Sequence, residues 1–387
     1  MKVLFLEWKS FGNEYMLETL AKKGVEVVRF PFPRESENTR NSEHLATSIA
    51  TELLKGGYTQ VFSFNYFPVA AIACKACKIP YVAWVYDSPF IQLYSQTIQY
   101  ETNHVFLFDS TECARLKALG VDTVDFLPMA GADKWYDKMV PNKEHHQKYD
   151  CDIAFIGSTY MEEKQHMFRH LKDLDPYTKG YLDGAMQMQK GLYGCNFLEQ
   201  ILTPDIVENM RKVCPVQSNG DGFETVEWIL ARYFLDRKVT AMERQEILEV
   251  LSDRYCVNLY TPEKTPQLPK IHNKGKIDYY LDAPYAMKCA KINLNISLRS
   301  IVDGIPLRAF DIMSAGGFLM TNYQADFLQF FVPDEDFVYF EDLEDLQAKV
   351  DYYLSHDIER EQIARNGYEK VKKFHSYDVR VEQMFGL

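Results

Sequence analysis

The sequence predicts an α/β protein made of two successive Rossmann-like domains, the second of which carries a helical insertion. Three observations predict this fold. The 387 residues are too many for one ordinary domain and suit two of roughly 150–200 residues. Short β-branched and aromatic runs alternate with amphipathic helical patterns, as in βαβ units with a parallel sheet. The alternation pauses near 134–149 and begins again with a strand at 151–156.

The first domain is expected over residues 1–140. Its expected strands are 2–7, 25–30, 60–64, 81–86, 104–108 and 123–127, and its expected helices lie near 12–23, 41–56, 68–78 and 109–119. Ligands of parallel α/β sheets bind beyond the carboxyl ends of the strands. The polar residues at these ends are therefore candidates for a binding site, although Asp109 is better explained as the N-cap of the next helix.

The second domain is expected over residues 141–375, after a polar interdomain connection at 134–149 that contains His145 and His146. Its expected strands are 151–156, 255–260, 291–296 and 317–321, and its expected helices are 283–290, 306–315, 342–354 and 357–373. Residues 160–253 are mostly helical, with glycine-rich interruptions near 180–194 and a turn at 218–222. A last helix, in residues 376–387, is expected to return to the first domain, and the two domains are expected to face each other across a cleft.

Composition limits the partners. The formal net charge is −12, and no run of Lys or Arg provides the basic surface that nucleic acid requires, so no nucleic-acid partner is expected. No stretch approaches the ~20 apolar residues of a membrane span, which leaves only peripheral contact with a membrane open. The N-terminus has the pattern of a strand rather than a signal peptide, and the eight cysteines are scattered. We therefore expect reduced thiols and a cytoplasmic protein.

The most informative stretch is residues 301–317. Gly304 permits a tight loop, and Pro306 suits the first turn of a helix. Arg308 and Asp311 are three residues apart and share one stripe of that helix. An arginine beside a helix N-terminus is suited to binding a diphosphate, and an acid one turn later can accept hydrogen bonds from ribose hydroxyls. This stretch therefore predicts a nucleotide-binding site.

The two acids Asp303 and Asp311, with seven residues between them and a helix that ends in glycine, resemble the donor-site motif of GT-B glycosyltransferases, in which a group 1-like C-terminal domain binds the donor. More closely, the chain resembles the bacterial spore-maturation-protein (CgeB-like) type of glycosyltransferase. The segments that carry this closer resemblance are 84–89, 106–109, 304–313, 316–319 and 321–324.

The resemblance implies a role for each donor-side residue. Gly157 and Ser158 would let the backbone approach the diphosphate, and Arg308 would pair with a phosphate. Asp311 would hold the ribose, and Asp303 would lie near the transferred sugar as a catalytic group.

Three further residues complete the expected donor site. Tyr260 and Thr261, after the strand at 255–260, would flank the base. Arg299, near the end of the strand at 291–296, could either reach the donor or tie a loop down, and the sequence leaves both alternatives open.

The acceptor side is expected in the first domain. An inverting transfer needs a base for the acceptor hydroxyl, and Asp87 follows the strand at 81–86, so it is the candidate base. An N-cap for a helix that begins near Pro89 is the alternative for this side chain. Trp8, Gly12 and Asn13 form the first strand-to-helix turn and are expected to touch the acceptor or the sugar.

No metal or cofactor is expected. Cys74 and Cys77 have C-x-x-C spacing but sit late in a helix, which favours a pair of buried thiols. Three Asp-x-Asp pairs, at 150/152, 173/175 and 334/336, lie in polar connections and are interpreted as solvated acids. His146 lies in the presumed connection and needs no metal, and no group of His and Cys has zinc spacing.

The resulting hypothesis is a bacterial, metal-independent glycosyltransferase, with transfer of a hexose expected, that acts in cell-surface glycan synthesis. It would move a sugar from a nucleoside-diphosphate sugar to an unidentified hydroxyl of a glycan, protein or small molecule. Two alternatives remain open: a nucleotide-sugar epimerase of the same fold, and a non-catalytic nucleotide-sugar-binding or scaffold protein.

Overall fold

A computed structural model describes residues 1–32, 38–163 and 165–387, which divide into two compact units. The first unit comprises Met1–Met129, Ser218–Glu224 and Tyr377–Leu387, and the second comprises Ala130–Gln217 and Thr225–Ser376. Each unit has its own six-stranded sheet, in which neighbouring strands pair in parallel. The predicted pair of parallel-sheet α/β domains is confirmed.

The sheet of the first unit has the strand order β2-β1-β3-β4-β5-β6. Its strands are β1 (Lys2–Glu7), β2 (Glu26–Pro31), β3 (Gln60–Phe64), β4 (Tyr81–Val85), β5 (Asn103–Leu107) and β6 (Val124–Phe126). Each one overlaps a predicted strand. Every residue of the central strand β4 is buried, because a strand inside a parallel sheet is covered on both faces, and this explains its continuous apolar run.

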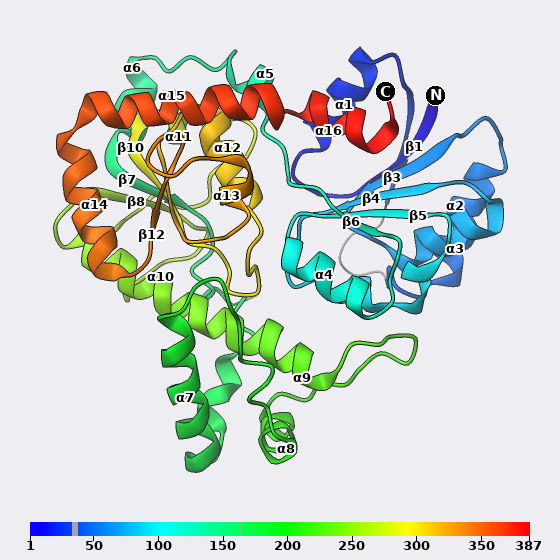
Figure 1. The fold of residues 1–387 in the computed structure, drawn as a ribbon, viewed down its shortest axis with the longest axis horizontal. Coiled ribbons are helices and arrows are strands. Elements are labelled where there is room, and N and C mark those ends of the chain that lie inside the picture. Colours follow the sequence, from blue (N-terminus) through cyan, green and yellow to red (C-terminus); the bar gives the residue numbers. More distant parts are fainter. Residues whose placement is uncertain (33–37, 164) are drawn as a thin grey trace. The chain divides into compact units, whose positions relative to one another are not determined.

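In the described part of the first unit, five α-helices and two short 3-10 turns accompany the sheet. They are α1 (Asn13–Lys22), α2 (Glu43–Leu53), α3 (Pro68–Cys77), α4 (Ser110–Ala118) and α16 (Tyr377–Phe385), with η1 (Ile91–Tyr94) and η2 (Gln96–Gln99). Helix α1 packs against α16, and α2 packs against α3 (Figure 1). The Asp109 carboxylate accepts a hydrogen bond from the Thr111 amide at 3.0 Å, so Asp109 is the N-cap of α4, as predicted.

The sheet of the second unit has the order β12-β11-β10-β7-β8-β9. Its strands are β7 (Cys151–Ile156), β8 (Val257–Tyr260), β9 (His272–Asn273), β10 (Ala290–Asn295), β11 (Leu319–Asn322) and β12 (Val338–Phe340). The two edge strands, β9 and β12, were not predicted, because two or three residues are too few to show a period. Ile153 and Phe155 pack in the larger core cluster, and Ala154 packs in a smaller one.

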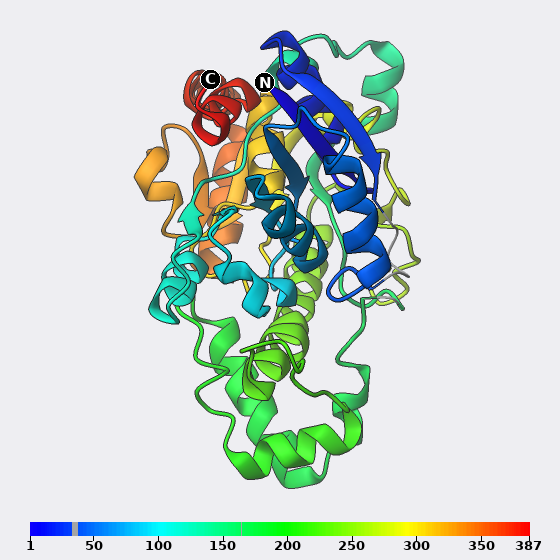
Figure 2. The same cartoon turned by 90° about the vertical axis from the view of Figure 1, so that its right-hand side faces the viewer.

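The second unit is rich in helices. Those outside the insertion are α5 (Asp133–Tyr136), α6 (Lys143–Tyr149), α11 (Ala283–Cys289), α12 (Leu307–Ser314), α13 (Phe327–Phe330), α14 (Leu343–Ser355) and α15 (Asp357–Phe374). The predicted insertion holds η3 (Arg169–Asp173), α7 (Pro176–Lys190), α8 (Pro204–Val213), α9 (Val226–Ile229), the π-helical turn η4 (Leu230–Leu235) and α10 (Asp236–Ser252). Helix α7 packs against the long α10, and α8 packs against α7; these green helices extend from α10 on the side away from the sheet (Figures 1 and 2).

Residues 134–149 are not the polar connection that the sequence predicted. They hold α5 and α6 inside the second unit, and the chain passes between the units at 129/130 rather than at 140/141. Helix α6 starts with a capping box between Asn142 and His145 and packs against α11. A short helix with a polar exposed face has the composition of a linker, which explains the wrong prediction.

Two details of the insertion also differ from the prediction. Helix α7 continues through Gly180 and Gly184, so those glycines do not interrupt it. The turn expected at 218–222 belongs to the first unit, where Asp221 forms an ion pair with Arg40 at 2.8 Å and Gly222 bridges to Ser95.

In the part of the chain that the structure describes, no helix combines the length and apolarity that crossing a membrane requires.

Candidate functional site

The loop after β7 forms the floor of the candidate site. Its first residue, Gly157, donates its amide hydrogen bond to the Tyr260 carbonyl at the end of β8, at 3.2 Å. The Ser158 hydroxyl donates to Glu162 at 2.5 Å and accepts from the Tyr160 amide at 2.8 Å. The loop therefore has a fixed internal geometry.

Glu162 fastens this loop to the end of β8. The buried carboxylate accepts hydrogen bonds from the Thr159 amide and from the Thr261 hydroxyl, both at 2.6 Å. Burial raises the pKa of Glu162, whereas the hydrogen bonds from Ser158, Thr261 and Thr159 lower it, and the net shift is downward. The carboxylate therefore stays ionised while it orders the loop. Sequence reasoning missed this residue, because Glu162 lies in an irregular polar stretch.

Arg308 lies in the first turn of α12, as predicted, and meets the loop after β7. Its Nη1 donates to the side-chain oxygen of Asn295 at 3.1 Å, and its guanidinium lies 5.3 Å from the ring centre of Phe155. A Cβ atom added to Gly157 would lie 2.7 Å from Nη2 of Arg308. Gly157 and Arg308, both expected at the diphosphate, therefore lie in contact, and this contact depends on glycine having no side chain.

A second arginine, Arg244 of α10, lies beside the same ring. Its guanidinium is 5.2 Å from the centre of Phe155, and it donates to the Ser158 carbonyl at 2.6 Å and the Ile296 carbonyl at 3.1 Å. Sequence reasoning missed Arg244 because it lies within the helical insertion, far from the motif. A signal was present, however: Arg244 lies on the buried stripe of α10 that includes Ile247 and Leu251.

The two arginines make the site strongly positive. Burial, together with repulsion by Arg244, lowers the pKa of Arg308 to about 10, and burial also lowers that of Arg244. Arginine stays protonated in proteins at neutral pH, so both guanidiniums carry a positive charge. Within residues 1–32, 38–163 and 165–387, no carboxylate forms an ion pair with either guanidinium. Buried charges are normally paired, so this arrangement is suited to an anionic ligand.

Asp311, expected near the ribose, is buried and already has protein partners. It accepts hydrogen bonds from the hydroxyls of Tyr136 at 3.1 Å and Tyr279 at 3.0 Å. Burial raises its pKa to about 7, although the two hydroxyls and Arg308 oppose that rise. Asp303 is only partly buried, and its carbonyl accepts a hydrogen bond from the Asp326 amide at 3.1 Å. The two acids of the motif therefore have very different environments.

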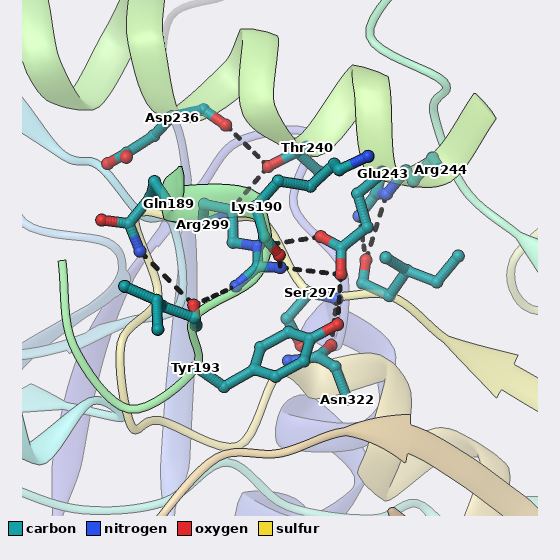
Figure 3. A network of polar contacts seen from close by, with 12 residues as sticks. Gln189, Lys190, Tyr193, Asp236, Thr240, Glu243, Arg244, Ser297, Arg299 and Asn322 are labelled. Atoms are coloured by element: carbon teal, nitrogen blue, oxygen red, sulfur yellow. Dashed lines mark hydrogen bonds and ion pairs between the residues drawn. The ribbon is translucent and has the colours of Figure 1, made fainter. Parts of the chain in front are cut away.

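Arg299 lies in an internal network rather than at the loop after β7 (Figure 3). Its guanidinium pairs with Glu243 at 2.8 and 2.9 Å and donates to the carbonyls of Leu192 and Lys190, both at 2.7 Å. It also lies 4.1 Å from the ring centre of Tyr193. All of these partners are protein groups, which favours the alternative that Arg299 ties down the loop after α7.

Tyr260 and Thr261 approach the site through their main chain. The Tyr260 ring packs in a core cluster with Tyr149 and Ala286, and the Thr261 hydroxyl is bonded to Glu162. Both side chains are buried. That this turn flanks the base stays a prediction, and the buried side chains leave its main chain as the available surface.

On the first unit, Asp87 is exposed at the carboxyl end of β4. It accepts a hydrogen bond from the Asn65 side-chain amide at 2.6 Å, and Asn65 also accepts one from the Tyr86 amide at 3.1 Å. The next helical turn begins at Ile91 with Phe90 as its N-cap. The helix-cap alternative for Asp87 is therefore wrong, and its role as a base stays a prediction.

The residues of the turn after β1 differ in how tightly the surrounding protein packs on them. The Trp8 indole donates to the Phe64 carbonyl at 2.8 Å and stacks on Tyr86, next to Asp87. Asn13 closes the turn by donating to the Trp8 carbonyl at 2.7 Å. Gly12 has φ 84°, and an added Cβ would lie 2.3 Å from the Tyr377 hydroxyl. The structure therefore packs Trp8 on Tyr86, the residue before Asp87, and covers Gly12.

All eight cysteines are free thiols. The prediction of two buried thiols in α3 holds for Cys74, whose pKa is raised by burial, whereas Cys77 is only half-buried.

We compared the chain with known protein families and solved structures. Residues 237–386 match the family model described as "Glycosyl transferase-like". Among solved structures, sucrose-phosphate synthase from Thermosynechococcus elongatus aligns over 100% of this chain and 98% of its own, with TM-score 0.55 and 12% identity. Anabaena HepE in complex with UDP-glucose aligns over 99% and 98%, with TM-score 0.55 and 11% identity.

A glycosyltransferase from Rickettsia africae aligns over 99% of this chain and 96% of its own, with TM-score 0.50 and 10% identity. No curated protein sequence matches the chain. The chain therefore has the fold of GT-B glycosyltransferases, and its C-terminal part matches the glycosyl transferase-like model.

Proposed function

We propose that the protein is a glycosyltransferase that moves a sugar from a nucleoside-diphosphate sugar to a hydroxyl acceptor. One observation carries the proposal: Arg244 and Arg308 lie on the same ring beside Gly157, with no carboxylate paired to either in the described residues. A diphosphate would supply the missing negative charge and accept bidentate hydrogen bonds from Arg308. The match of residues 237–386 to the glycosyl transferase-like model supports the same site.

The chemistry follows from where charge develops. When the bond from the sugar to the diphosphate breaks, negative charge grows on the leaving phosphate. Arg308, Arg244 and the positive start of α12 are oriented before the reaction and stabilise that charge. Because two guanidiniums can neutralise the leaving group, we propose that the transfer needs no metal ion or other cofactor.

Asp311 would serve the ribose. An ionised carboxylate can accept about four hydrogen bonds, so the bonds from Tyr136 and Tyr279 leave capacity for a ribose hydroxyl. Asp303 would lie beside the sugar. On the first unit, Asp87 would remove the proton of the acceptor hydroxyl, and Asn65 would orient its carboxylate.

The finer assignment rests on the motif in residues 304–324. Its resemblance to the spore-maturation type supports a cytoplasmic bacterial enzyme that transfers a hexose into a cell-surface glycan. Anabaena HepE, with the same fold, was solved with UDP-glucose, so a UDP-sugar is the first donor to test.

The test is a thermal-shift and calorimetric screen of UDP, GDP, dTDP and CMP, each alone and as its sugar. A ligand that binds only the folded state raises the melting temperature. We expect one nucleotide to bind the wild type, Arg308→Ala to bind it far more weakly, and the matched control Arg254→Ala to bind it normally. Arg254 is an exposed arginine of the same unit, paired with Asp351. Equal affinity of the Arg308 and Arg254 variants would refute the site.

Product analysis separates the alternative functions. A transferase releases nucleoside diphosphate in the presence of acceptor, and NMR of the donor shows a new glycosidic bond. A changed sugar configuration without acceptor would indicate an epimerase. Tight binding with no release of nucleotide from any donor would indicate a binding or scaffold protein.

A further inference from the structure

Three side chains of types that can bind metals meet at the amino-terminal ends of the two central strands β7 and β10 of the second unit's sheet. His146 lies in α6, Asp150 directly precedes β7, and Cys289 is the last residue of α11. Their ligand atoms lie within 4.8 Å of one another. Sequence spacing predicted no such group, because Cys289 lies far along the chain from the other two. We propose that these three residues bind one divalent transition-metal ion of the zinc class.

The ligand set selects this class of metal. An imidazole nitrogen, a carboxylate oxygen and a thiolate sulfur are the ligands that Zn²⁺ takes in tetrahedral sites. Mg²⁺ and Ca²⁺ prefer oxygen ligands alone, so the sulfur of Cys289 disfavours both. His146 and Asp150 are exposed and Cys289 is half-buried, so an ion can reach all three from solvent. With three protein ligands, a fourth position remains for water.

The helices that carry the ligands are already clamped together. The His145 ring stacks on Tyr285 of α11, with 3.7 Å between ring centres. The Tyr149 hydroxyl donates to Asp282, which lies just before α11, at 2.5 Å. His146 Nδ1 lies 2.9 Å from the Asp150 carboxylate. Binding would therefore need only small side-chain movements, which reduces the cost of ordering the site.

The site is remote from the arginines. Asp150 lies before the first residue of β7 and Gly157 after its last, and six strand residues span about 20 Å. A bound ion would therefore cross-link α6, β7 and α11 and stabilise the second unit, without touching the diphosphate. The inference does not depend on the proposed sugar transfer.

The experiment is a Co²⁺ titration of the full chain, followed by competition with Zn²⁺. We expect a thiolate-to-cobalt charge-transfer band in the wild type, displaced by Zn²⁺ but not by excess Mg²⁺. Cys289→Ser should abolish the thiolate band, and His146→Ala should weaken binding at least about tenfold. Zn²⁺ should raise the melting temperature of the wild type and not that of Cys289→Ser.

The matched control is Cys256→Ser. Cys256 Sγ lies 3.6 Å from His272 Nδ1, so this is another Cys–His pair of the same unit, and the variant should keep the band. Circular dichroism without metal would verify that each variant folds. Absence of a thiolate band in the wild type, or a band that survives Cys289→Ser, would overturn the proposal.

Discussion

Two arginine centres lie in the second unit near the end of β10, and they differ in what surrounds the charge. Arg299 is buried against the Glu243 carboxylate and two carbonyls. Arg308 donates a hydrogen bond to the neutral side chain of Asn295 and has a second cation, Arg244, as its neighbour. We call the first the closed centre and the second the open centre.

The difference shows how a structural arginine can be told from a binding one. In the closed centre, protein groups satisfy the guanidinium, so a ligand would have to displace a carboxylate. In the open centre, no carboxylate of the described residues forms an ion pair with the guanidiniums of Arg308 and Arg244, so an anion can bind them without displacing one. Sequence reasoning placed Arg308 at the donor and left two alternatives open for Arg299, donor binding or tying down a loop. Only the partners of each guanidinium in the structure distinguish the two arginines.

Removing Arg299 from the closed centre should have the largest effect on stability. Arg299→Ala leaves the buried Glu243 carboxylate without its cation, and we expect the free energy of unfolding to fall by about 3–5 kcal/mol. Urea denaturation measures this. Replacing both residues with apolar ones of similar size should recover much of the loss. A loss below about 1 kcal/mol would contradict a closed, structural centre.

Asp311, one helical turn after Arg308 in α12, should make the free energy of unfolding depend on pH. Burial raises the pKa of Asp311 to about 7, against about 3.9 in an unfolded chain, so between these values the folded state holds a proton that the unfolded state has lost. Stability should therefore fall as pH rises from about 4 to about 7, by roughly 4 kcal/mol from this group. Comparing Asp311→Asn with the wild type isolates the effect, and identical pH profiles would contradict it.

Removing Arg308 should weaken nucleotide binding more than it lowers the free energy of unfolding. We expect Arg308→Ala to weaken binding of the nucleotide by about 2 kcal/mol, roughly thirtyfold, because charged hydrogen bonds contribute about 1.5–3 kcal/mol. Its unfolding free energy should change by less than about 1 kcal/mol, because removing Arg308 relieves its repulsion with Arg244. Calorimetry and urea denaturation on the same preparation test both. A stability loss as large as that of Arg299→Ala would remove the contrast between the centres.

A smaller effect should follow from filling the space beside Arg308. In Gly157→Ala the new methyl would lie 2.7 Å from Nη2 of Arg308, so the guanidinium must shift. We expect binding of the nucleotide to weaken about threefold to tenfold, with a stability change near 1 kcal/mol. Gly180→Ala is the matched control, since nothing lies within 4 Å of its added Cβ. Equal affinity of the two variants would argue against the contact.

Much of the fold was predictable because many helices and strands are specified by local patterns of residues close together in the sequence. The apolar run of β4 and the Gly304–Pro306 start of α12 are local patterns. The prediction was wrong where local composition misleads: α6 is polar and short, so it resembled a linker, yet packing on α11 makes it part of the second unit. The two-residue strand β9 has no period to detect, since its pairing with β8 defines it.

By itself, the sequence determined the two parallel sheets and the position of Arg308 in the first turn of α12. Only the tertiary structure decided the electrostatics. Glu243 lies 56 positions before Arg299, and Tyr136 lies 175 before Asp311. The interaction of two charges depends on their distance in space and on their burial, and neither is encoded in their separation along the chain.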